Sequence, residues 1–249
     1  MKKILVATIL LTLSLFGSNK PLLRFYCGIT MVKPMKIIAK KIEQKYNCKI
    51  EIIQGGSRDL YQSLSYSKVG DLYLPGSETY ITKNKKDGFF QRSEYIGYNQ
   101  AAIFVLKNNP KNIKTLDRLL DENVATILCN PDSGSIGKMT KKILIKYKGE
   151  EFYEDAFDAT VAIGTDSRNL NKALIEKDAD MTINWRATGF WPENARFITV
   201  VPIDKKFAPK KKLMLTLLSF SNHKKIANAF IDYATSKQGQ QIMKKYGFK

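Results

Sequence analysis

The residues Gly55-Gly56-Ser57 are the clearest candidate for a binding site in this 249-residue chain. They follow an apolar, β-branched run that ends at Ile53, and Ser57 opens a helical pattern that reaches Leu64. Glycines let a backbone approach a ligand, a serine donates its hydroxyl, and the free N–H groups of a helix start carry partial positive charge. The segment can therefore hold an anion, although the same residues also suit a tight turn and a helix cap.

Similar turns recur in both halves of the chain, at residues 27–30, 130–135 and 165–168. Each follows a short apolar run, carries small or hydroxyl-bearing residues and precedes a helical pattern. One such turn is commonplace. Several of them at the carboxyl ends of strands indicate two sheets that face one cleft, because open α/β sheets bind ligands at this edge.

Strand and helix patterns alternate along the chain, which predicts an α/β fold with right-handed crossovers. We expect two Rossmann-like lobes joined by a hinge, with mixed, mostly parallel sheets and two helices at the end of the chain. The expected strands span residues 22–26, 49–53, 70–74, 101–106, 124–128, 160–163, 180–184, 198–203 and 213–220.

The two lobes are expected to interleave, because no linker or low-complexity tract divides the chain into independent domains. We place lobe 1 at residues 19–100 plus 208–249 and lobe 2 at residues 101–207. The crossings would lie near Asn99 and between residues 203 and 213.

Residues 1–18 have the pattern of an export signal. Lys2 and Lys3 precede an uncharged apolar stretch over residues 4–16, which is shorter than the roughly 20 residues of a membrane-spanning helix. We therefore expect export to the periplasm. Bulky residues stand where a cleavage site prefers small ones, so an uncleaved anchor is the alternative.

The formal net charge of +18 raises the question of a nucleic-acid partner. The lysines are spread over the polar faces of several helical patterns, and no zinc-finger or RNA-recognition signature accompanies them. We expect a solvated basic surface with a bias toward anionic ligands, and no nucleic-acid partner.

Cysteine and histidine residues offer little chemistry in this sequence. Cys27, Cys48 and Cys129 allow at most one intramolecular disulfide and require none. They are interpreted as small buried hydrophobes, with a thiol site for a metal or arsenite at Cys27 and Cys129 as the alternative. The single His223 has no partners at ligand spacing. We expect neither a metal nor a cofactor.

A binding protein is favoured over an enzyme. The sequence contains no carboxylate pair, Ser-His-Asp arrangement or His/Cys cluster. Cys129 is the one candidate nucleophile, as in a transferase with a Cys-linked cofactor.

From Phe25 to Lys249 the chain resembles the type 2 periplasmic solute-binding proteins of ABC transporters, most closely the molybdate/tungstate-binding branch and its surface-antigen and colonisation-factor relatives. The resemblance implies a monomer that closes on a ligand by hinge motion and docks on a membrane permease. A ligand-sensing or adhesin-type protein on the same fold is the alternative. The passages that carry the resemblance are residues 27–31, Gln54-Gly55-Gly56-Ser57, Gly70-Asp71-Leu72-Tyr73-Leu74, and the ending 233–248 with Ser236-Lys237-Gln238-Gly239-Gln240-Gln241 and Lys245-Tyr246-Gly247-Phe248.

In the molybdate-binding relatives a tetrahedral oxyanion is held by hydroxyls and backbone N–H groups from both lobes. Carried over by motif, the first-lobe hydroxyls fall on Thr30 and Ser57. The second-lobe backbone donors fall near Ser135 and Ser167. Trp185 stands where the family has a tyrosine that contacts the oxyanion.

Three arginines lie next to these positions. Arg58 and Arg168 each follow a candidate serine, and Arg186 follows Trp185. Neutral dipoles suffice for bare molybdate or sulfate, so nearby guanidinium groups favour a bulkier or more highly charged anion, such as a phosphate ester or a polycarboxylate. Some of these arginines could instead point outward, because successive residues at a helix start face different ways.

Overall fold

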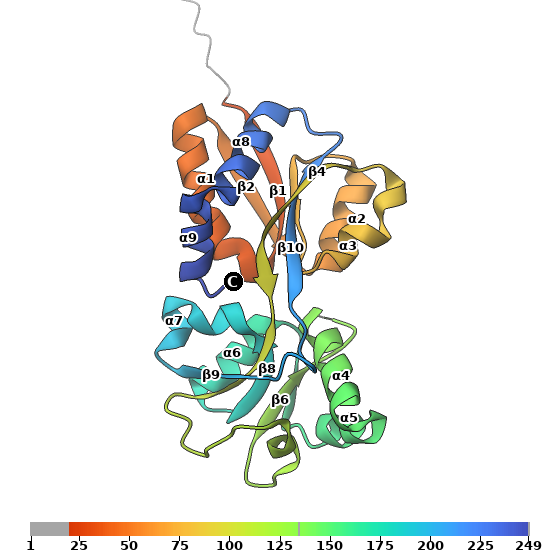
Figure 1. Cartoon of the computed structure of the whole chain (residues 1–249), viewed down its shortest axis with the longest axis vertical. Helices are drawn as coiled ribbons and strands as arrows, with labels where there is room; N and C mark the ends of the chain where they lie inside the picture. The colour runs from red at the N-terminus through yellow and green to blue at the C-terminus, as the bar shows by residue number, and fades with distance from the viewer. Residues whose placement is uncertain (1–19, 134, 249) are drawn as a thin grey trace, which may run out of the picture.

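The computed structural model describes residues 20–133 and 135–248 as two α/β lobes arranged end to end (Figure 1). Each lobe is built on one five-stranded sheet with helices packed against it. The predicted fold of two Rossmann-like lobes is confirmed. The predicted signal segment, residues 1–18, lies outside the described residues.

The first sheet has the strand order β2-β1-β3-β10-β4. Its strand β1 pairs in parallel with β2 and β3, whereas β10 pairs in antiparallel orientation with β3 and β4. Because β10 comes from the end of the chain, both ends of the described chain build this lobe. The strands are β1 (Leu22–Gly28), β2 (Lys49–Gly55), β3 (Leu72–Leu74), β4 (Phe90–Asn99) and β10 (Lys211–Leu218).

The second sheet repeats this plan with the order β7-β6-β8-β5-β9. Its strand β6 pairs in parallel with β7 and β8, and β5 pairs in antiparallel orientation with β8 and β9. Both sheets are mixed, as predicted, with a larger antiparallel share than the sequence indicates. The strands are β5 (Ala101–Leu106), β6 (Thr126–Cys129), β7 (Ala162–Gly164), β8 (Met181–Trp185) and β9 (Ile198–Pro202).

Amphipathic helices cover both faces of each sheet (Figure 1). In the first helix Met35, Ile38 and Ile42 share one buried face, and the helix ends at Asn47 in the left-handed conformation. The helices are η1 (Ile29–Met31), α1 (Val32–Tyr46), α2 (Ser57–Ser67), α3 (Thr79–Lys83), η2 (Lys85–Asp87), η3 (Leu116–Leu120), α4 (Ser135–Lys148), α5 (Glu150–Asp158), α6 (Ser167–Glu176), η4 (Arg186–Phe190), α7 (Pro192–Ala195), α8 (Lys224–Thr235) and α9 (Lys237–Lys245).

Strand β4 is absent from the strands predicted from the sequence. β4 carries polar residues along most of its length and is only partly buried, so its sequence lacks the alternation that marks a strand. Its conformation comes from the register with β10, which spans the length of the strand and is interrupted by two irregularities. Pairing with β10 therefore determines the strand conformation of β4, and the local sequence propensity does not.

Each lobe has its own hydrophobic core. In the first lobe the rings of Phe25 and Phe230 meet edge to face with centroids 5.2 Å apart, which joins β1 to helix α8 near the end of the chain. In the second lobe Phe104, Leu128 and Ile143 are fully buried in a separate cluster. Two independent cores allow the lobes to move as units.

Several contacts tie the two lobes together beside the crossing strands. The amide of Gln100, at the first crossing, donates to the carbonyl of Ala208 on the returning segment at 3.1 Å. Lys33 on α1 pairs with Glu193 on α7, and its Nζ also lies 4.8 Å from the ring centre of Trp191. The contacts of Lys33 join one lobe to the other on the side of the molecule where the segment from η4 to α7 meets α1.

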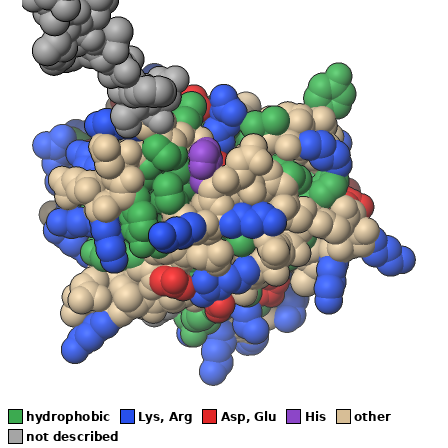
Figure 2. Space-filling model, turned by 90° about the horizontal axis from the view of Figure 1, so that it is seen from above, with side chains coloured by type: hydrophobic (Ala, Val, Ile, Leu, Met, Phe, Trp, Pro, Cys, Tyr) green, Lys and Arg blue, Asp and Glu red, His purple; other side chains and the backbone are tan. Residues whose placement is uncertain are grey.

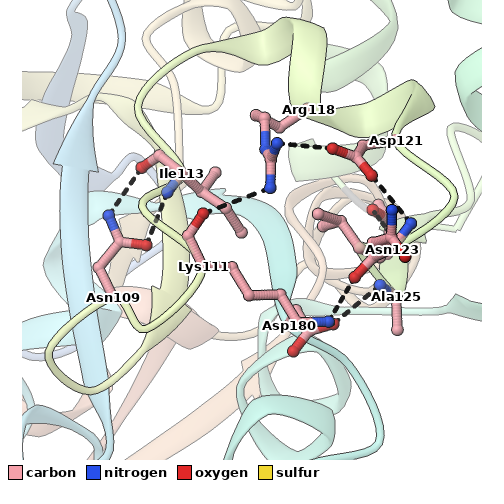
Figure 3. Close-up of polar contacts among 10 residues, drawn as sticks. Asn109, Lys111, Ile113, Arg118, Asp121, Asn123, Ala125 and Asp180 are labelled. Carbon is pink, nitrogen blue, oxygen red and sulfur yellow. Dashed lines mark hydrogen bonds and ion pairs between the residues drawn. The ribbon is translucent and has the colours of Figure 1, made fainter.

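Polar side chains brace the long loop between β5 and β6 at the far end of the second lobe (Figure 3). The side chain of Asn109 exchanges two hydrogen bonds with the backbone of Ile113, at 2.8 and 2.9 Å. Asp180 accepts from both the Lys111 ammonium at 2.6 Å and the Ala125 N–H at 2.9 Å. This network fixes a loop that lies away from the sheet edges where the lobes meet.

Basic side chains are dispersed over the surface. Seen from above in Figure 2, Lys and Arg side chains surround this end of the molecule without gathering into a single patch. Among the described residues no helix combines the length and the apolar character that crossing a membrane requires.

Candidate functional site

A cavity of about 320 Å³ lies between the lobes, at the carboxyl ends of strands from both sheets. Its walls include Thr30, Ser57 and Gly76 from the first lobe. Ser135, Ser167 and Trp185 face it from the second lobe. The structure therefore brings together six of the eight predicted site residues, which are the five with hydroxyl or indole groups and Arg168.

Four helical segments begin at this cavity. The continuous run of η1 and α1 starts after β1, α2 starts after β2, α4 follows the turn after β6, and α6 follows β7. Each of these starts presents backbone N–H groups that have no partner within its own helix. Their partial positive charges point at one space from several directions, which suits an anion without requiring a charged side chain.

Ser57 is held in position to donate its hydroxyl proton. Its Oγ accepts a hydrogen bond from the N–H of Gly76 at 2.9 Å, and its carbonyl accepts from the Tyr73 hydroxyl at 3.0 Å. Because the oxygen already accepts from Gly76, the hydroxyl proton is free for another acceptor. The N-cap of α2 is Gly56, which has no side chain to occupy the first-turn N–H groups.

Ser135 has the same arrangement in the second lobe. Its Oγ accepts a hydrogen bond from the indole N–H of Trp185 at 3.2 Å, and Trp185 is almost fully buried. The hydroxyl proton of Ser135 is therefore also available to a ligand. The indole thus positions a donor hydroxyl.

Thr30 lies deeper in the first lobe. Its Oγ1 accepts from the amide of Asn99 at 3.2 Å and donates to the Met31 sulfur at 2.7 Å. A thioether is a weak acceptor, so an anion would compete well for this proton. The Oδ1 atom of Asn99 is buried and has no hydrogen-bond partner among the described residues.

The start of α6 is partly occupied by an acidic side chain. Asp166 accepts from the backbone N–H groups of Arg168 and Asn169, at 2.6 and 3.3 Å, and from the Arg168 guanidinium at 2.6 Å. Burial raises the pKa of Asp166, but the hydrogen bonds from Arg168 outweigh this effect and leave the pKa below its ordinary value. Asp166 therefore stays ionised and neutralises Arg168. Ser167 is buried beside this pair.

The structure places the other two arginines outside this cavity. Arg58 is exposed on α2 and lines a second, adjoining cavity. Arg186 donates to the Gly247 carbonyl at 2.6 Å, and its guanidinium stacks on Phe190 at 4.3 Å. Burial lowers the pKa of Arg186, and its contacts join η4 to the chain end. This placement favours a structural role for Arg186.

Gly76 lines the cavity and Asn99 supports Thr30 next to it, and neither belongs to the predicted set of site residues. A Cβ atom at residue 76 would lie 3.4 Å from the Ser57 Oγ and 3.9 Å from the Asn99 Nδ2. The sequence holds a signal for Gly76, because Pro75-Gly76-Ser77 ends a strand as the other turns do. Asn99 carries no comparable signal.

The described residues offer no group of three His, Cys, Asp or Glu side chains that could hold a metal ion. Cys27 and Cys129 are buried free thiols, and burial raises the pKa of both. A raised pKa keeps a thiol protonated at neutral pH, which makes it a poor nucleophile.

We expect that Trp185→Phe weakens ligand binding about fivefold, the value of one neutral hydrogen bond, because Ser135 loses the N–H that orients it. The chain has two tryptophans, so tryptophan emission during a ligand titration reports on Trp185 if the Trp191→Phe control keeps the response. Calorimetry gives the affinity of each variant. An emission change that disappears in the Trp191 variant and persists in the Trp185 variant would contradict this assignment.

Similarity to known proteins extends over nearly the whole chain. The sequence family described as bacterial extracellular solute-binding protein matches residues 23–249. A putative binding protein of Haemophilus influenzae is 25% identical over 248 residues, which are 100% of this chain and 98% of that protein.

Solved structures with similar folds cover as much of the chain. The periplasmic molybdate-binding protein of Azotobacter vinelandii has a TM-score of 0.77 at 12% identity, with 91% of this chain and 98% of that chain covered. PEB3, a Campylobacter jejuni protein, was solved with L-phospholactate and has a TM-score of 0.71 at 19% identity, with 91% and 99% covered. At these identities the likeness shows the fold.

Proposed function

The chain belongs to the family of bacterial extracellular solute-binding proteins, and we propose that it captures a small tetrahedral oxyanion in the cavity between its lobes. Molybdate, tungstate, sulfate and phosphate are the candidate oxyanions. The bound group is either a free anion of this kind or the tetrahedral group of a larger organic anion. In this proposal the N-terminal segment exports the protein to the periplasm, and the loaded monomer delivers its ligand to the permease of an ABC transporter.

The meeting of Ser57 and Ser135 around Gly76 is the observation that carries this proposal. A Cβ atom at residue 76 would lie 3.4 Å from one serine oxygen and 3.7 Å from the other. Each oxygen already accepts an N–H donor, so both hydroxyl protons are free to bind an anion. Two donors from opposite lobes thus face the same space beside Gly76.

The arrangement also explains how binding would be coupled to closure. An anion that contacts donors from both lobes makes its full set of interactions only when the lobes are together. Such a ligand shifts the population toward the closed form by the difference between its affinities for the closed and open forms. A permease that recognises the closed form would then select the loaded protein.

The ligands named for structural neighbours are compatible with this class. The Azotobacter vinelandii protein is named for molybdate, and PEB3 was solved with L-phospholactate. Molybdate and the phosphate group of L-phospholactate are both tetrahedral oxyanions. The shared two-lobed fold supports a ligand cleft between the lobes of this chain.

Thermal unfolding in the presence of an anion panel tests the proposal. Molybdate, tungstate, sulfate, phosphate and small phosphonates are added in turn to the mature chain. An anion at 100 times its dissociation constant stabilises the folded state by about 2.7 kcal/mol, which raises the unfolding temperature by several degrees. If every member of the panel leaves the unfolding temperature unchanged, the proposal is wrong.

We expect that Ser57→Ala lowers the affinity for the bound anion about tenfold, the value of one hydrogen bond to a charged group. Ser65→Ala is the matched control, because Ser65 lies on the same helix and its hydroxyl is exposed and bonded to the Gln62 carbonyl. Calorimetric titration of both variants measures the effect. Equal affinities in the two variants would remove Ser57 from the site.

A further inference from the structure

A second cavity, of about 230 Å³, adjoins the oxyanion cavity and shares Ser135 and Trp185 with it. It lies between α2 and α3 of the first lobe and α4 of the second. We call it the basic annexe, because five cationic side chains line it: Arg58, Lys83, Lys138, Lys142 and Lys211. No carboxylate appears among its described lining residues.

The described residues contain no ion pair that engages a cation of the basic annexe. Ion pairs within the described chain engage nine other lysines and arginines, among them Arg168 in the oxyanion cavity, which is paired with Asp166. Like charges in one partly enclosed space repel, and a bound anion relieves that repulsion.

The cations also come from both lobes. Arg58, Lys83 and Lys211 belong to the first lobe, whereas Lys138 and Lys142 lie one turn apart on α4 of the second. Closing the lobes therefore brings like charges toward each other. This repulsion opposes closure around a ligand that fills only the oxyanion cavity, and a ligand with a second anionic group reverses the effect.

The two cavities have different chemistry. The oxyanion cavity offers neutral hydroxyl and N–H donors and has Asp59 and Asp166 among its lining residues, whereas the annexe offers full positive charges. Tyr80, Met139 and the ring of Trp185 add apolar surface between the cations. A carbon linker can pass along this surface from one cavity to the other.

We infer that the ligand is a two-ended organic anion, with a phosphate or phosphonate head in the oxyanion cavity and a second acidic group, such as a carboxylate, in the basic annexe. This inference rests on the proposed function and narrows its substrate class. A short carbon chain joins the two groups, since the cavities share part of their walls.

Matched phosphonates test the inference. Phosphonoacetate, 3-phosphonopropionate and 4-phosphonobutyrate are titrated by calorimetry beside ethyl-, propyl- and butylphosphonate, which have the same carbon number and lack the carboxylate. We expect the carboxylate to raise the affinity at least about tenfold in one pair, as a charge-assisted hydrogen bond does. Equal affinities in all three pairs would overturn the inference and leave the oxyanion proposal standing. No binding by any phosphonate or by inorganic phosphate would overturn the inference, and the oxyanion proposal would fall with it only if molybdate, tungstate and sulfate also failed to bind.

A charge variant identifies the annexe as the source of the effect. We expect the affinity ratio between each carboxylated phosphonate and its plain counterpart to fall most of the way to one in the Lys138→Gln/Lys142→Gln double variant. Lys146→Gln is the control, because Lys146 is exposed on the same helix and lines neither cavity. An unchanged ratio in the double variant, or an equal fall in the control, would overturn the assignment to this annexe.

Discussion

Gly76→Leu should abolish oxyanion binding while the protein stays folded. A Cβ at this position would stand 3.4 Å from the Ser57 Oγ and 3.7 Å from the Ser135 Oγ, so a longer side chain extends into the space between the two hydroxyls. We expect an affinity loss of more than about 100-fold, equivalent to about 2.7 kcal/mol. Calorimetric titration with the best-bound anion measures it.

Gly76→Ala and the ligand-free unfolding temperature serve as controls for this result. The alanine Cβ distances are ordinary van der Waals contacts, so this variant should fold normally and lose less affinity than the leucine variant. The Gly76 N–H that supports Ser57 remains in both variants. A leucine variant that binds as well as the wild type would place the ligand elsewhere.

Gly137→Ala should damage both stability and binding, because α4 packs on the backbone of the turn after β6 at this residue. A Cβ on Gly137 would lie 2.2 Å from the Asn130 carbonyl oxygen, far inside van der Waals contact. Alanine ordinarily stabilises a helix interior by roughly 0.5–1 kcal/mol over glycine. Overpacking costs about 1–3 kcal/mol or more, so we expect a net loss of about 2 kcal/mol.

The binding effect follows from the position of Ser135, which lies one half-turn before Gly137 on α4. Relief of the clash moves the start of α4, together with the Ser135 hydroxyl, away from the turn. We therefore expect anion binding to weaken about 30-fold, which corresponds to about 2 kcal/mol. Chemical denaturation and calorimetry measure the two effects. Lys146→Ala on the exposed side of the helix is the control, and a Gly137→Ala protein with wild-type stability would contradict the packing argument.

The parts of the fold that local sequence determines were predictable. Strand β5 is a continuous buried apolar run, and its predicted bounds match Ala101–Leu106. The turns between strands and helices were also predictable, because glycine and serine at the end of a strand are typical turn residues. The predicted residues Thr30, Ser57, Ser135 and Ser167 therefore lie around one cavity.

Other features depend on partners far apart in the sequence. Arg186 is engaged by Gly247, which lies 61 residues away, and no local pattern announces that pairing. Asp166, one residue before the candidate donor Ser167, accepts hydrogen bonds from the backbone N–H and the guanidinium of Arg168. Arg168 is therefore paired with a carboxylate at the start of α6. The role of Asn99 follows from the contact between the end of β4 and Thr30 in η1, and sequence spacing gives no sign of this contact.

The basic annexe suggests a role for Arg58, the arginine that follows Ser57. Its side chain lies on the same helix start as the proposed hydroxyl donor, yet it faces the neighbouring cavity together with four lysines. Hydroxyls and helix starts would therefore recognise the oxyanion, while the cations would recognise what is attached to it. Selectivity between a free oxyanion and an organic phosphate would be set by the second group.

Calorimetric titration of the wild-type protein, with Ser57→Ala and Ser135→Ala in parallel, tests the central claim most directly. The titrants are molybdate, tungstate, sulfate, phosphate and the phosphonates. We predict that at least one anion binds with a dissociation constant near or below about 10 µM. Each serine variant should lower the affinity for this anion about tenfold, because each lobe donates one serine hydroxyl to it. Heats no larger than those of dilution across the whole panel, or wild-type affinity in both serine variants, would contradict the account.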